Sequence, residues 1–346
     1  MSTPLALPFD AWPDVDKQMW QDLIRCGGLL DEAGPLSHLR LTTQDMLYRH
    51  YGRWIGWLGR ADPAAVLEPP PQRLTVARMT GWLVNLSHTS PVSQHMFVKS
   101  TLWVLKSADP DHDWRLQERA VLWLEHKATN HISHRKDGRV LSSAWLLKAG
   151  LKLAGPDADA ASTPLKAAKF RRDGAIVALL AVMPMRRRSF IELELGTSFE
   201  VTADHIKVWL DGDMTKNKLR WDTAVPEILE PVLRRYMEDV RPWFLSRGGQ
   251  SHNVLWVDNR GAPYAANYFG HRICQITEGI TGVRVSPHLF RDAAATTLSR
   301  TSPKDSRLIR PLLAHASFGI AERHYIQACA IDVSKNYAEI LDEQLA

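Results

Sequence analysis

The chain has 346 residues, of which 45% are hydrophobic and 23% charged, a balance typical of folded proteins and not of disordered chains or coiled coils. Its longest stretch without charged or hydrogen-bonding side chains, residues 175–185, has 11 residues, whereas a membrane-spanning helix needs about 20. No cationic segment precedes an apolar one at the start, so we expect no secretory signal, no membrane partner and a cytoplasmic protein. The three cysteines show no spacing typical of a disulfide framework or a metal site.

The net charge of +5 is distributed unevenly along the chain. Residues 1–137 carry 15 basic and 15 acidic side chains, whereas residues 126–188 carry 13 basic and four acidic ones. A surface formed by the second stretch would attract a polyanion such as nucleic acid. A solvated basic face with no ligand would show the same charge count.

The first part of the chain is predicted to be helical. Residues 42–45 resemble a capping box, and the apolar residues that follow at helical spacing predict an amphipathic helix. Further helices are expected from about residue 75, after Pro91 and after the break at 109–111. We therefore predict a less regular N-terminal arm (1–40), a helical module (41–130) and a basic linker (131–139).

Beyond the linker the pattern is mixed. Helices near 141–153 and 162–183 precede runs of β-forming residues at 199–202, 206–210 and 219–224, and a turn-rich hairpin tip at 211–218 separates the last two. A short strand at 253–257 is followed by helices only. The predicted fold class is mainly α with a small antiparallel β-sheet (α+β), and residues 140–346 form the second domain.

Three separated segments combine arginine, histidine and tyrosine side chains. The first is a run of arginines at 186–188 that enters a helix. The second opens another helix and puts His288 and Arg291 on one face, because residues three apart are neighbours on a helix. The third places Tyr325 ten residues after His315.

This set resembles the tyrosine recombinases, also called phage integrases. Their pattern is an arginine at a helix start, a lysine on a β-hairpin, a His-x-x-Arg helix, a Leu-Gly-His-like element and a nucleophilic tyrosine about nine residues later. All five elements occur here in that order. The resemblance implies a helical core-binding domain before a catalytic domain, with these catalytic residues: Arg186, Lys216, His288, Arg291, His315 and Tyr325.

Two of these assignments involve a choice between neighbours. Apolar residues follow the family's first arginine at the fourth, fifth and seventh positions, and counting from Arg186 they are Phe190, Ile191 and Leu193. Counted from either of the next two arginines, the same positions include glutamate. On the hairpin, the first lysine takes the role by position, and Lys218 is the reserve candidate.

The resemblance implies metal-free phosphodiester chemistry. Two guanidinium groups, those of Arg186 and Arg291, would clamp the nonbridging oxygens and offset their charge in the transition state. Tyr325 would be the nucleophile, Lys216 would protonate the departing 5′ oxygen, and His288 would assist proton transfer. His315 would donate a hydrogen bond to the phosphate. No cofactor is expected, because the cationic side chains supply what divalent ions supply in other enzymes.

The sequence also departs from the family pattern at four places. Nine residues separate His315 from Tyr325 where eight are commonest. Ser189 stands where an acidic residue is often found, Asp292 stands where many members have a second histidine, and Ala314 replaces the usual glycine. These differences concern the positioning of the catalytic groups more than the class of reaction.

By resemblance, the two domains are expected to form a C-shaped clamp around duplex DNA, with a tetramer on two attachment sites, a Holliday junction and accessory DNA-bending or directionality factors. Residues 331–346 would pack on a neighbouring protomer or on their own domain. The predicted contacts to the DNA backbone come mainly from the basic stretch: Arg135, Lys136, Arg139, Lys169, Arg171, Arg172 and Arg187.

Two kinds of alternative remain open at this point. A type IB topoisomerase or a hairpin-forming resolvase would use the same residues and differ in its product. A non-catalytic DNA-binding protein on the integrase scaffold would retain DNA affinity without forming a covalent complex with DNA.

Overall fold

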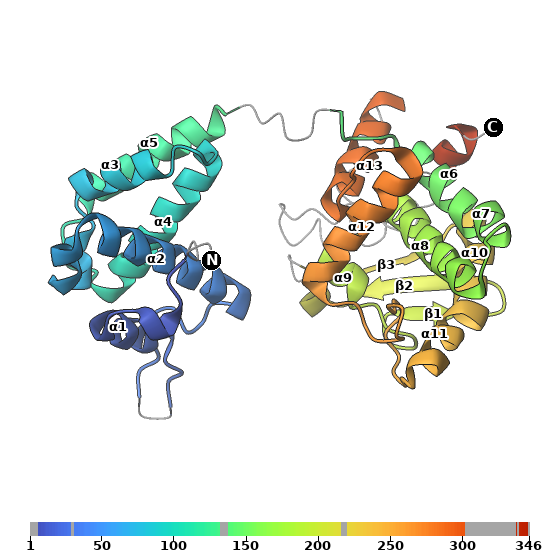
Figure 1. Ribbon diagram of the computed structural model, residues 1–346, viewed down its shortest axis with the longest axis horizontal. Helices are drawn as coiled ribbons and strands as arrows, with labels where there is room; N and C mark the ends of the chain where they lie inside the picture. The colour runs from blue at the N-terminus through green and yellow to red at the C-terminus, as the bar shows by residue number, and fades with distance from the viewer. Residues whose placement is uncertain are drawn as a thin grey trace. The chain divides into compact units, whose positions relative to one another are not determined.

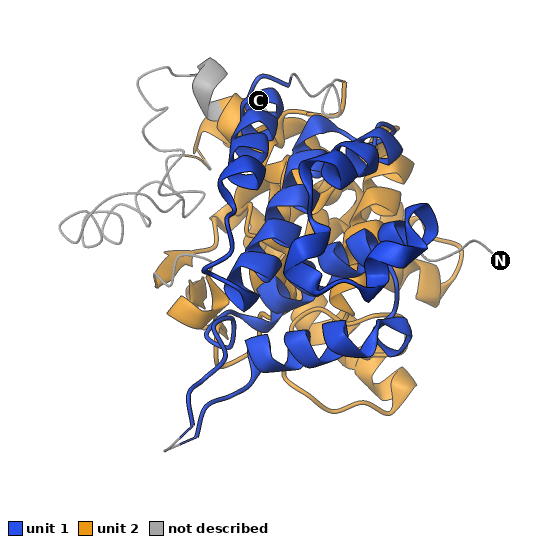
Figure 2. Ribbon diagram, turned by 90° about the vertical axis from the view of Figure 1, so that its left-hand side faces the viewer, with its two compact units in different colours: residues 1–133 blue, residues 134–346 orange. Residues whose placement is uncertain are grey.

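The computed structural model describes residues 6–28, 31–131, 138–215, 220–301, 337 and 339–344, with residues 298–301 described by their backbone alone. The chain forms two compact units, residues 1–133 and 134–346, which are coloured separately in Figure 2. The boundary falls inside the segment 131–139 that the sequence analysis identified as a linker. No helix in the described part is long and apolar enough to cross a bilayer.

The elements are labelled in Figure 1. Unit 1 contains five α-helices in its described part: α1 (Asp14–Ile24), α2 (Leu41–Ala61), α3 (Val76–Asn85), α4 (Pro91–Ala108) and α5 (Arg115–Thr129). The described elements of unit 2 are α6 (Ser143–Ala154), α7 (Pro156–Asp159), α8 (Pro164–Val182), α9 (Arg187–Ile191), β1 (Phe199–Val201), β2 (Ile206–Leu210), β3 (Trp221–Ala224), α10 (Glu230–Arg235), α11 (Arg241–Gly248), α12 (Ala266–Thr281) and α13 (Pro287–Thr301).

The predicted fold class is confirmed. The three strands form one antiparallel sheet in the order β1-β2-β3, with Phe199 opposite Val208 and Leu210 opposite Trp221. The strand expected at 253–257 is wrong: Val254 and Val257 make only isolated bridges to other segments. Residues 255–257 are fully buried. A short run of apolar residues can therefore indicate a buried segment that is not a strand, and the sequence pattern alone does not separate the two cases.

Described residues of the predicted N-terminal arm belong to the core of unit 1. Trp12 and Trp20 are buried against α2 residues. The carboxylate of Asp16 on α1 is completely buried, where it accepts hydrogen bonds from the Tyr51 hydroxyl (2.6 Å) and from Arg73 Nη1 (2.7 Å). A buried carboxylate requires such partners, so this ion pair fastens α1 to α2 and to the turn at 70–73.

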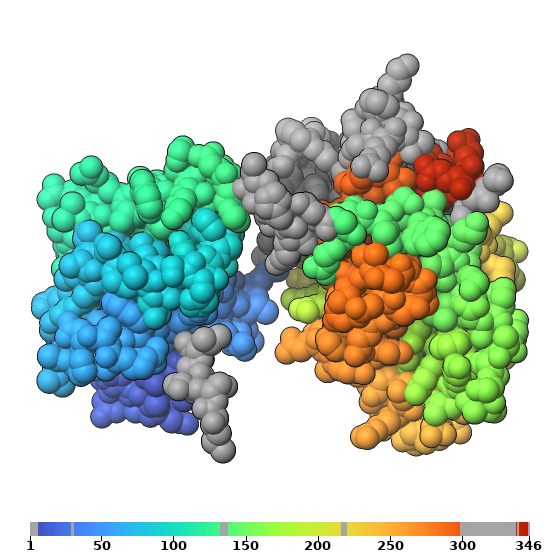
Figure 3. All heavy atoms as spheres, turned by 45° about the horizontal axis from the view of Figure 1, so that its top comes forward, coloured from blue at the N-terminus to red at the C-terminus, as the bar shows by residue number. Residues whose placement is uncertain are grey.

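Helix α8 lies in the middle of unit 2, with α6 and α13 beside it (Figure 1). Every residue from Arg172 to Val182 is buried, so the helix is enclosed on all sides over this length. It crosses α6 at two glycines: a Cβ atom on Gly174 would lie 2.5 Å from the Gly150 carbonyl oxygen. In Figure 3 the orange region of α12 and α13 lies directly beside the green region of α6.

The close crossing of α6 and α8 predicts that Gly174→Ala destabilises unit 2. The added methyl group overlaps backbone atoms of α6, and overpacking of this kind costs about 1–3 kcal/mol. Gly279→Ala is the matched control, because a Cβ atom there meets nothing within 4 Å; that change is expected to stabilise the helix by about 0.4–1 kcal/mol. Chemical denaturation measures both, and equal effects of the two substitutions would contradict the packing described.

The buried ion pair of unit 1 predicts that Asp16→Ala is strongly destabilising. The substitution leaves the Arg73 guanidinium buried without its counter-ion, a loss of about 3–5 kcal/mol. Asp14→Ala removes a carboxylate that is 99% exposed and paired with Lys17, so we expect a change within about 0.5 kcal/mol. Thermal unfolding followed by circular dichroism tests both, and a mild effect of Asp16→Ala would show that α1 contributes little to unit 1.

Candidate active site

The first arginine of the candidate site lies at the beginning of α9. After α8 the chain passes through the buried segment 183–185, and Arg186 is the N-cap residue of α9. Phe190, four residues later, is fully buried and stacks on Trp256 with ring centroids 5.1 Å apart. Packing of this apolar face leaves Arg186 half-buried at the edge of the core, whereas Arg187 and Arg188 are exposed.

The second arginine reaches the same place from α13. Arg291 is only 6% exposed, and its Nη1 donates a hydrogen bond of 2.6 Å to the carbonyl oxygen of Pro184, two residues before Arg186. Burial and the positive charge of Arg186 lower the pKa of Arg291 to about 10, and the carboxylate of Asp292 acts in the opposite direction. Two guanidinium groups that are far apart in sequence therefore lie close enough to repel each other.

Hydrogen bonds from two neighbouring helices hold α13, which carries Arg291, in place. The loop before α13 is held by Thr277 of α12, whose hydroxyl accepts a hydrogen bond from Val285 N at 2.9 Å. The N-terminal end of α6 bonds α13 as well, through Ser143 N and the Thr297 hydroxyl. His288 lies one turn before Arg291 and is exposed, so solvent and ligands reach its imidazole ring.

The guanidinium group of Arg186 has no hydrogen-bond or ion-pair partner among the residues that the structure describes, and burial lowers its pKa. A half-buried guanidinium beside a buried one carries donors that a carboxylate or phosphate oxygen would satisfy. The pair of Arg186 and Arg291 therefore favours an oxyanion as its ligand. In the described part of the chain, no group of histidine, cysteine and acidic side chains is arranged to hold a metal ion.

Ser189 joins α9 to the end of the β-hairpin. Its side chain is buried, and the hydroxyl donates a hydrogen bond of 2.6 Å to the carbonyl oxygen of Met214. Met214 ends a 3-10 turn (Gly212–Met214) that follows β2, and Thr215 after it is also buried. The next residue, Lys216, lies outside the described residues, as do four other site residues of the sequence analysis: Arg135, Lys136, His315 and Tyr325.

The C-terminal residues that the structure describes pack on their own unit. Tyr337 is fully buried and donates a hydrogen bond of 3.1 Å to the carbonyl oxygen of Ala181 in α8, and Leu341 is buried in the same core. Within the single chain, Tyr337 and Leu341 therefore contact the core of their own unit.

One of the predicted DNA contacts is wrong. Arg172 is 1% exposed and binds Asp173 (2.8 Å), the carbonyl oxygen of Val257 and the side chain of Asn259. Asp173 also pairs with Arg272 of α12. The charge count did not show this, because neighbouring positions on a helix point about 100° apart, and one arginine of a pair can face the core while the other faces solvent.

The other described candidates remain at the surface. Arg171 pairs with Asp159 at 2.9 Å. Arg139 donates two hydrogen bonds, of 2.7 and 3.2 Å, to the carbonyl oxygen of Arg284, in the loop that leads into α13. Lys169 is partly exposed, and the exposed side chain of Arg187 packs against Gly270 of α12. The carbonyl oxygens of Pro184 and Met214 could not be identified from the sequence, because every residue has a main-chain acceptor.

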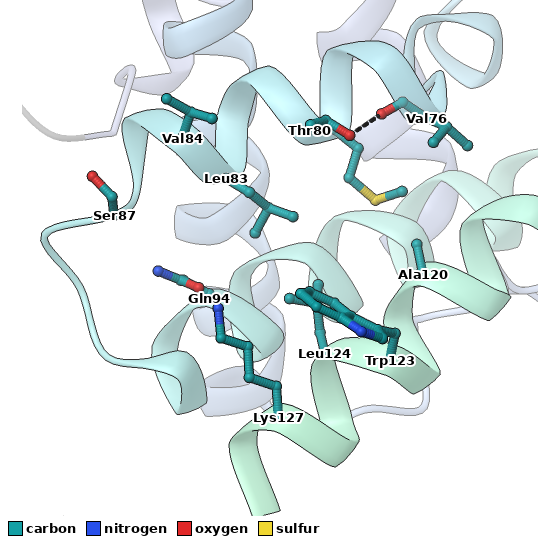
Figure 4. A pocket seen from close by; sticks show the side chains of 11 residues that line it. Val76, Thr80, Leu83, Val84, Ser87, Gln94, Ala120, Trp123, Leu124 and Lys127 are labelled. Carbon is teal, nitrogen blue, oxygen red and sulfur yellow. Dashed lines mark hydrogen bonds between the residues drawn. The ribbon is translucent and has the colours of Figure 1, made fainter.

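Unit 1 has a groove between α3 and α5 (Figure 4), with a volume of about 610 Å³. Its lining is mostly apolar, and Trp123, which is 61% exposed, lies at one side with the ammonium group of Lys127 over its ring. Lys127 is the charged residue of the lining, and the groove holds no nucleophile paired with a base. All six catalytic residues that the sequence predicts fall in unit 2.

Comparison with known proteins agrees with this location. The model of the phage integrase family matches residues 158–330, which is half of the chain. Tyrosine recombinase XerD of Yersinia pestis is 36% identical over 92 residues, which cover 26% of this chain and 30% of the relative. Tyrosine recombinase XerC of Bacillus subtilis (strain 168) is 24% identical over 142 residues, which cover 38% of this chain and 46% of the relative. The chain thus aligns with less than half of the length of either protein.

A solved structure extends the likeness to most of the chain. A crystal structure of the XerH site-specific recombinase, in a post-cleavage complex with a palindromic difH substrate, has a TM-score of 0.55 and 14% sequence identity, covering 83% of this chain and 76% of that one. At this identity the likeness concerns the fold alone. The family match over the segment that carries both arginines, together with the two curated relatives, shows that the chain belongs to the phage integrase family of tyrosine recombinases.

Proposed function

We propose that this chain is a site-specific DNA recombinase that cleaves and rejoins DNA through a 3′-phosphotyrosine intermediate. The observation that carries the proposal is the convergence of Arg186 and Arg291 at the junction of α8 and α9. The scissile phosphate is the anion that a polynucleotide brings to such a pair, and each guanidinium offers a fixed fork of donors to its nonbridging oxygens.

The proposed reaction assigns each residue the role that the family resemblance implies. The phenolic oxygen of Tyr325 attacks phosphorus and forms a new O–P bond, so the phosphate at the 3′ end of the cleaved strand becomes attached to the tyrosine. The bond from phosphorus to the 5′ oxygen breaks. Lys216 protonates the departing 5′ oxygen, while His288 takes up the phenol proton and His315 donates a hydrogen bond to the phosphate. The energy of the broken phosphodiester is retained in the phosphotyrosine, so rejoining is the reverse of the same steps.

The chain's partners are proposed on the same basis. Double-stranded attachment sites would be bound mainly through phosphate contacts by Arg139, Lys169, Arg187 and two linker residues, Arg135 and Lys136. A tetramer on two sites would exchange strands through a Holliday junction, with accessory DNA-bending or directionality factors. The same chemistry would serve the integration or excision of a mobile element or the resolution of chromosome dimers.

The arginine pair predicts an oxyanion site that can be detected without DNA. Inorganic sulfate is expected to raise the thermal stability of the protein relative to sodium chloride of equal ionic strength, by about 1–1.5 kcal/mol at ten times its dissociation constant. Arg186→Gln should abolish this difference because it removes one of the two clamping groups. Differential scanning fluorimetry provides the measurement.

Arg188→Gln is the matched control for this experiment. Arg188 is exposed and paired with Glu192, so its loss should leave the sulfate effect unchanged. If sulfate stabilised all three proteins equally, the effect would be one of general ion exclusion, and the proposed anion site would have to be abandoned.

The proposed reaction predicts a covalent complex with DNA. The protein is incubated in EDTA with candidate attachment DNA that carries a nick next to the cleavage position, so that the released fragment diffuses away and rejoining is blocked. A protein–DNA band that resists denaturation is expected with the wild type and is expected to be absent with Tyr325→Phe, which lacks the nucleophilic oxygen. Tight DNA binding by the wild type without any such band would favour the non-catalytic DNA-binding alternative.

A further inference from the structure

Arg139, at the end of the linker, is bound to the loop that leads into α13. Its Nη2 and Nε atoms donate hydrogen bonds of 2.7 and 3.2 Å to the carbonyl oxygen of Arg284. Among the described residues, no other group bonds this oxygen. Arg284 comes four residues before His288 and seven before Arg291. The bond therefore holds the chain where it enters the helix that carries two residues of the proposed site.

The next residue of this loop is held by α12. Val285 is fully buried, and its N–H donates a hydrogen bond of 2.9 Å to the hydroxyl of Thr277. The first turn of α13 follows at once, with Leu289 N bonded to the carbonyl oxygen of Ser286 at 2.8 Å. Two consecutive loop residues are thus fixed by side chains from two segments that are far apart in sequence, and Arg139 supplies the contact that α12 does not make.

The chain that follows Arg139 also holds a later turn of α13. Ser143 is fully buried, and its N–H donates a hydrogen bond of 3.2 Å to the hydroxyl of Thr297. Helix α6, which begins at this serine, lies beside α13 (Figure 1). Residues 139–143 therefore contact α13 and its loop at points that lie before and after Arg291 in the sequence.

An arginine is chemically suited to the bond with the loop. Its planar guanidinium group presents N–H donors in a fixed fork, and two of them meet one carbonyl oxygen here. A hydrogen bond from a charged donor is about twice as strong as one between neutral groups. A glutamine at position 139 would lack both the fork and the charge, so the loop would be held from the side of α12 alone.

We propose that Arg139 is a positioning residue that fixes the start of α13, and thereby the location of His288 and Arg291. This inference rests on the proposed function and is additional to the phosphate contact proposed for Arg139. The two roles have different consequences. A phosphate contact strengthens the binding of DNA, whereas a positioning bond acts after DNA is bound, because Arg291 must meet a nonbridging oxygen at hydrogen-bond distance in the transition state.

The test measures the single-turnover rate constant for formation of the covalent complex on nicked attachment DNA, at a saturating DNA concentration. Arg139→Gln is expected to lower this rate constant about tenfold, since a displacement of about 1 Å can reduce a catalytic rate about 10²-fold. Saturation removes the effect of a weaker phosphate contact. A single-turnover rate constant also does not depend on the fraction of the variant that is folded.

Arg284→Gln is the matched control. The side chain of Arg284 is 43% exposed and pairs with Glu278 at 2.6 Å, so its loss should change stability little. This variant loses one positive charge from the same loop but keeps the carbonyl oxygen that Arg139 binds. Its rate constant is expected to lie within about twofold of the wild-type value. The difference between the two variants therefore reports the bond and not the charge.

A second measurement needs neither DNA nor the nucleophile. Inorganic sulfate is titrated into each protein and its dissociation constant is obtained from the rise in thermal stability. Because displacement of Arg291 removes charged donors from the anion, Arg139→Gln is expected to raise the dissociation constant for sulfate about fivefold. Arg284→Gln should leave it within about twofold of the wild-type value.

Two results would overturn the inference. Equal rate constants for Arg139→Gln and Arg284→Gln would mean that the bond does not position α13. Weaker DNA binding by Arg139→Gln, with a salt dependence reduced by about one counter-ion and an unchanged rate constant, would mean that Arg139 is a phosphate contact alone. Failure of the wild-type protein to form a covalent complex is a distinct outcome that contradicts the proposed function. The sulfate measurement then decides by itself, and equal dissociation constants for the two variants would refute the positioning of Arg291.

Discussion

The enclosure of α8 is the constraint on which unit 2 depends. Its C-terminal half is buried on all sides, so the surrounding elements must cover every face of it. Helix α6 approaches closely enough to do so because glycines occupy both sides of the crossing. The C-terminal residues contribute as well, since Tyr337 bonds a carbonyl oxygen of α8. The helix ends in the buried segment that leads directly to Arg186, and the core thereby fixes where the first arginine lies.

The site consists of positive charges held together against their mutual repulsion. Arg291 is buried and near Arg186, and both effects disfavour its charge, as the lowered pKa indicates. The hydrogen bond to the Pro184 carbonyl offsets part of that cost, since a charged donor bound to a backbone acceptor is stronger than a neutral pair. Two neighbouring guanidinium groups repel each other less when a phosphate is bound between them, as expected for a site that binds a charged ligand.

Buried polar groups also fasten unit 1, but with a different outcome. The Asp16 carboxylate is matched by Tyr51 and Arg73, so this cluster is electrically balanced and needs no ligand. The same comparison separates Arg172 from Arg186. Arg172 has Asp173 and two oxygen acceptors around it, whereas Arg186 has none among the described residues. Balance of charge, and not burial, distinguishes a structural arginine from a candidate binding arginine.

The sequence by itself determined the family and the mainly helical fold class, because periodic apolar residues and the order of motifs are properties of residue identity. It did not determine which of two adjacent arginines on α8 faces the core, nor that residues 253–257 are buried without forming a strand. Those depend on contacts between segments that are distant in the chain. The hydrogen bonds to the carbonyl oxygens of Pro184 and Met214 also depend on such contacts. Every residue has a carbonyl group, and only the tertiary structure decides which one a side chain meets.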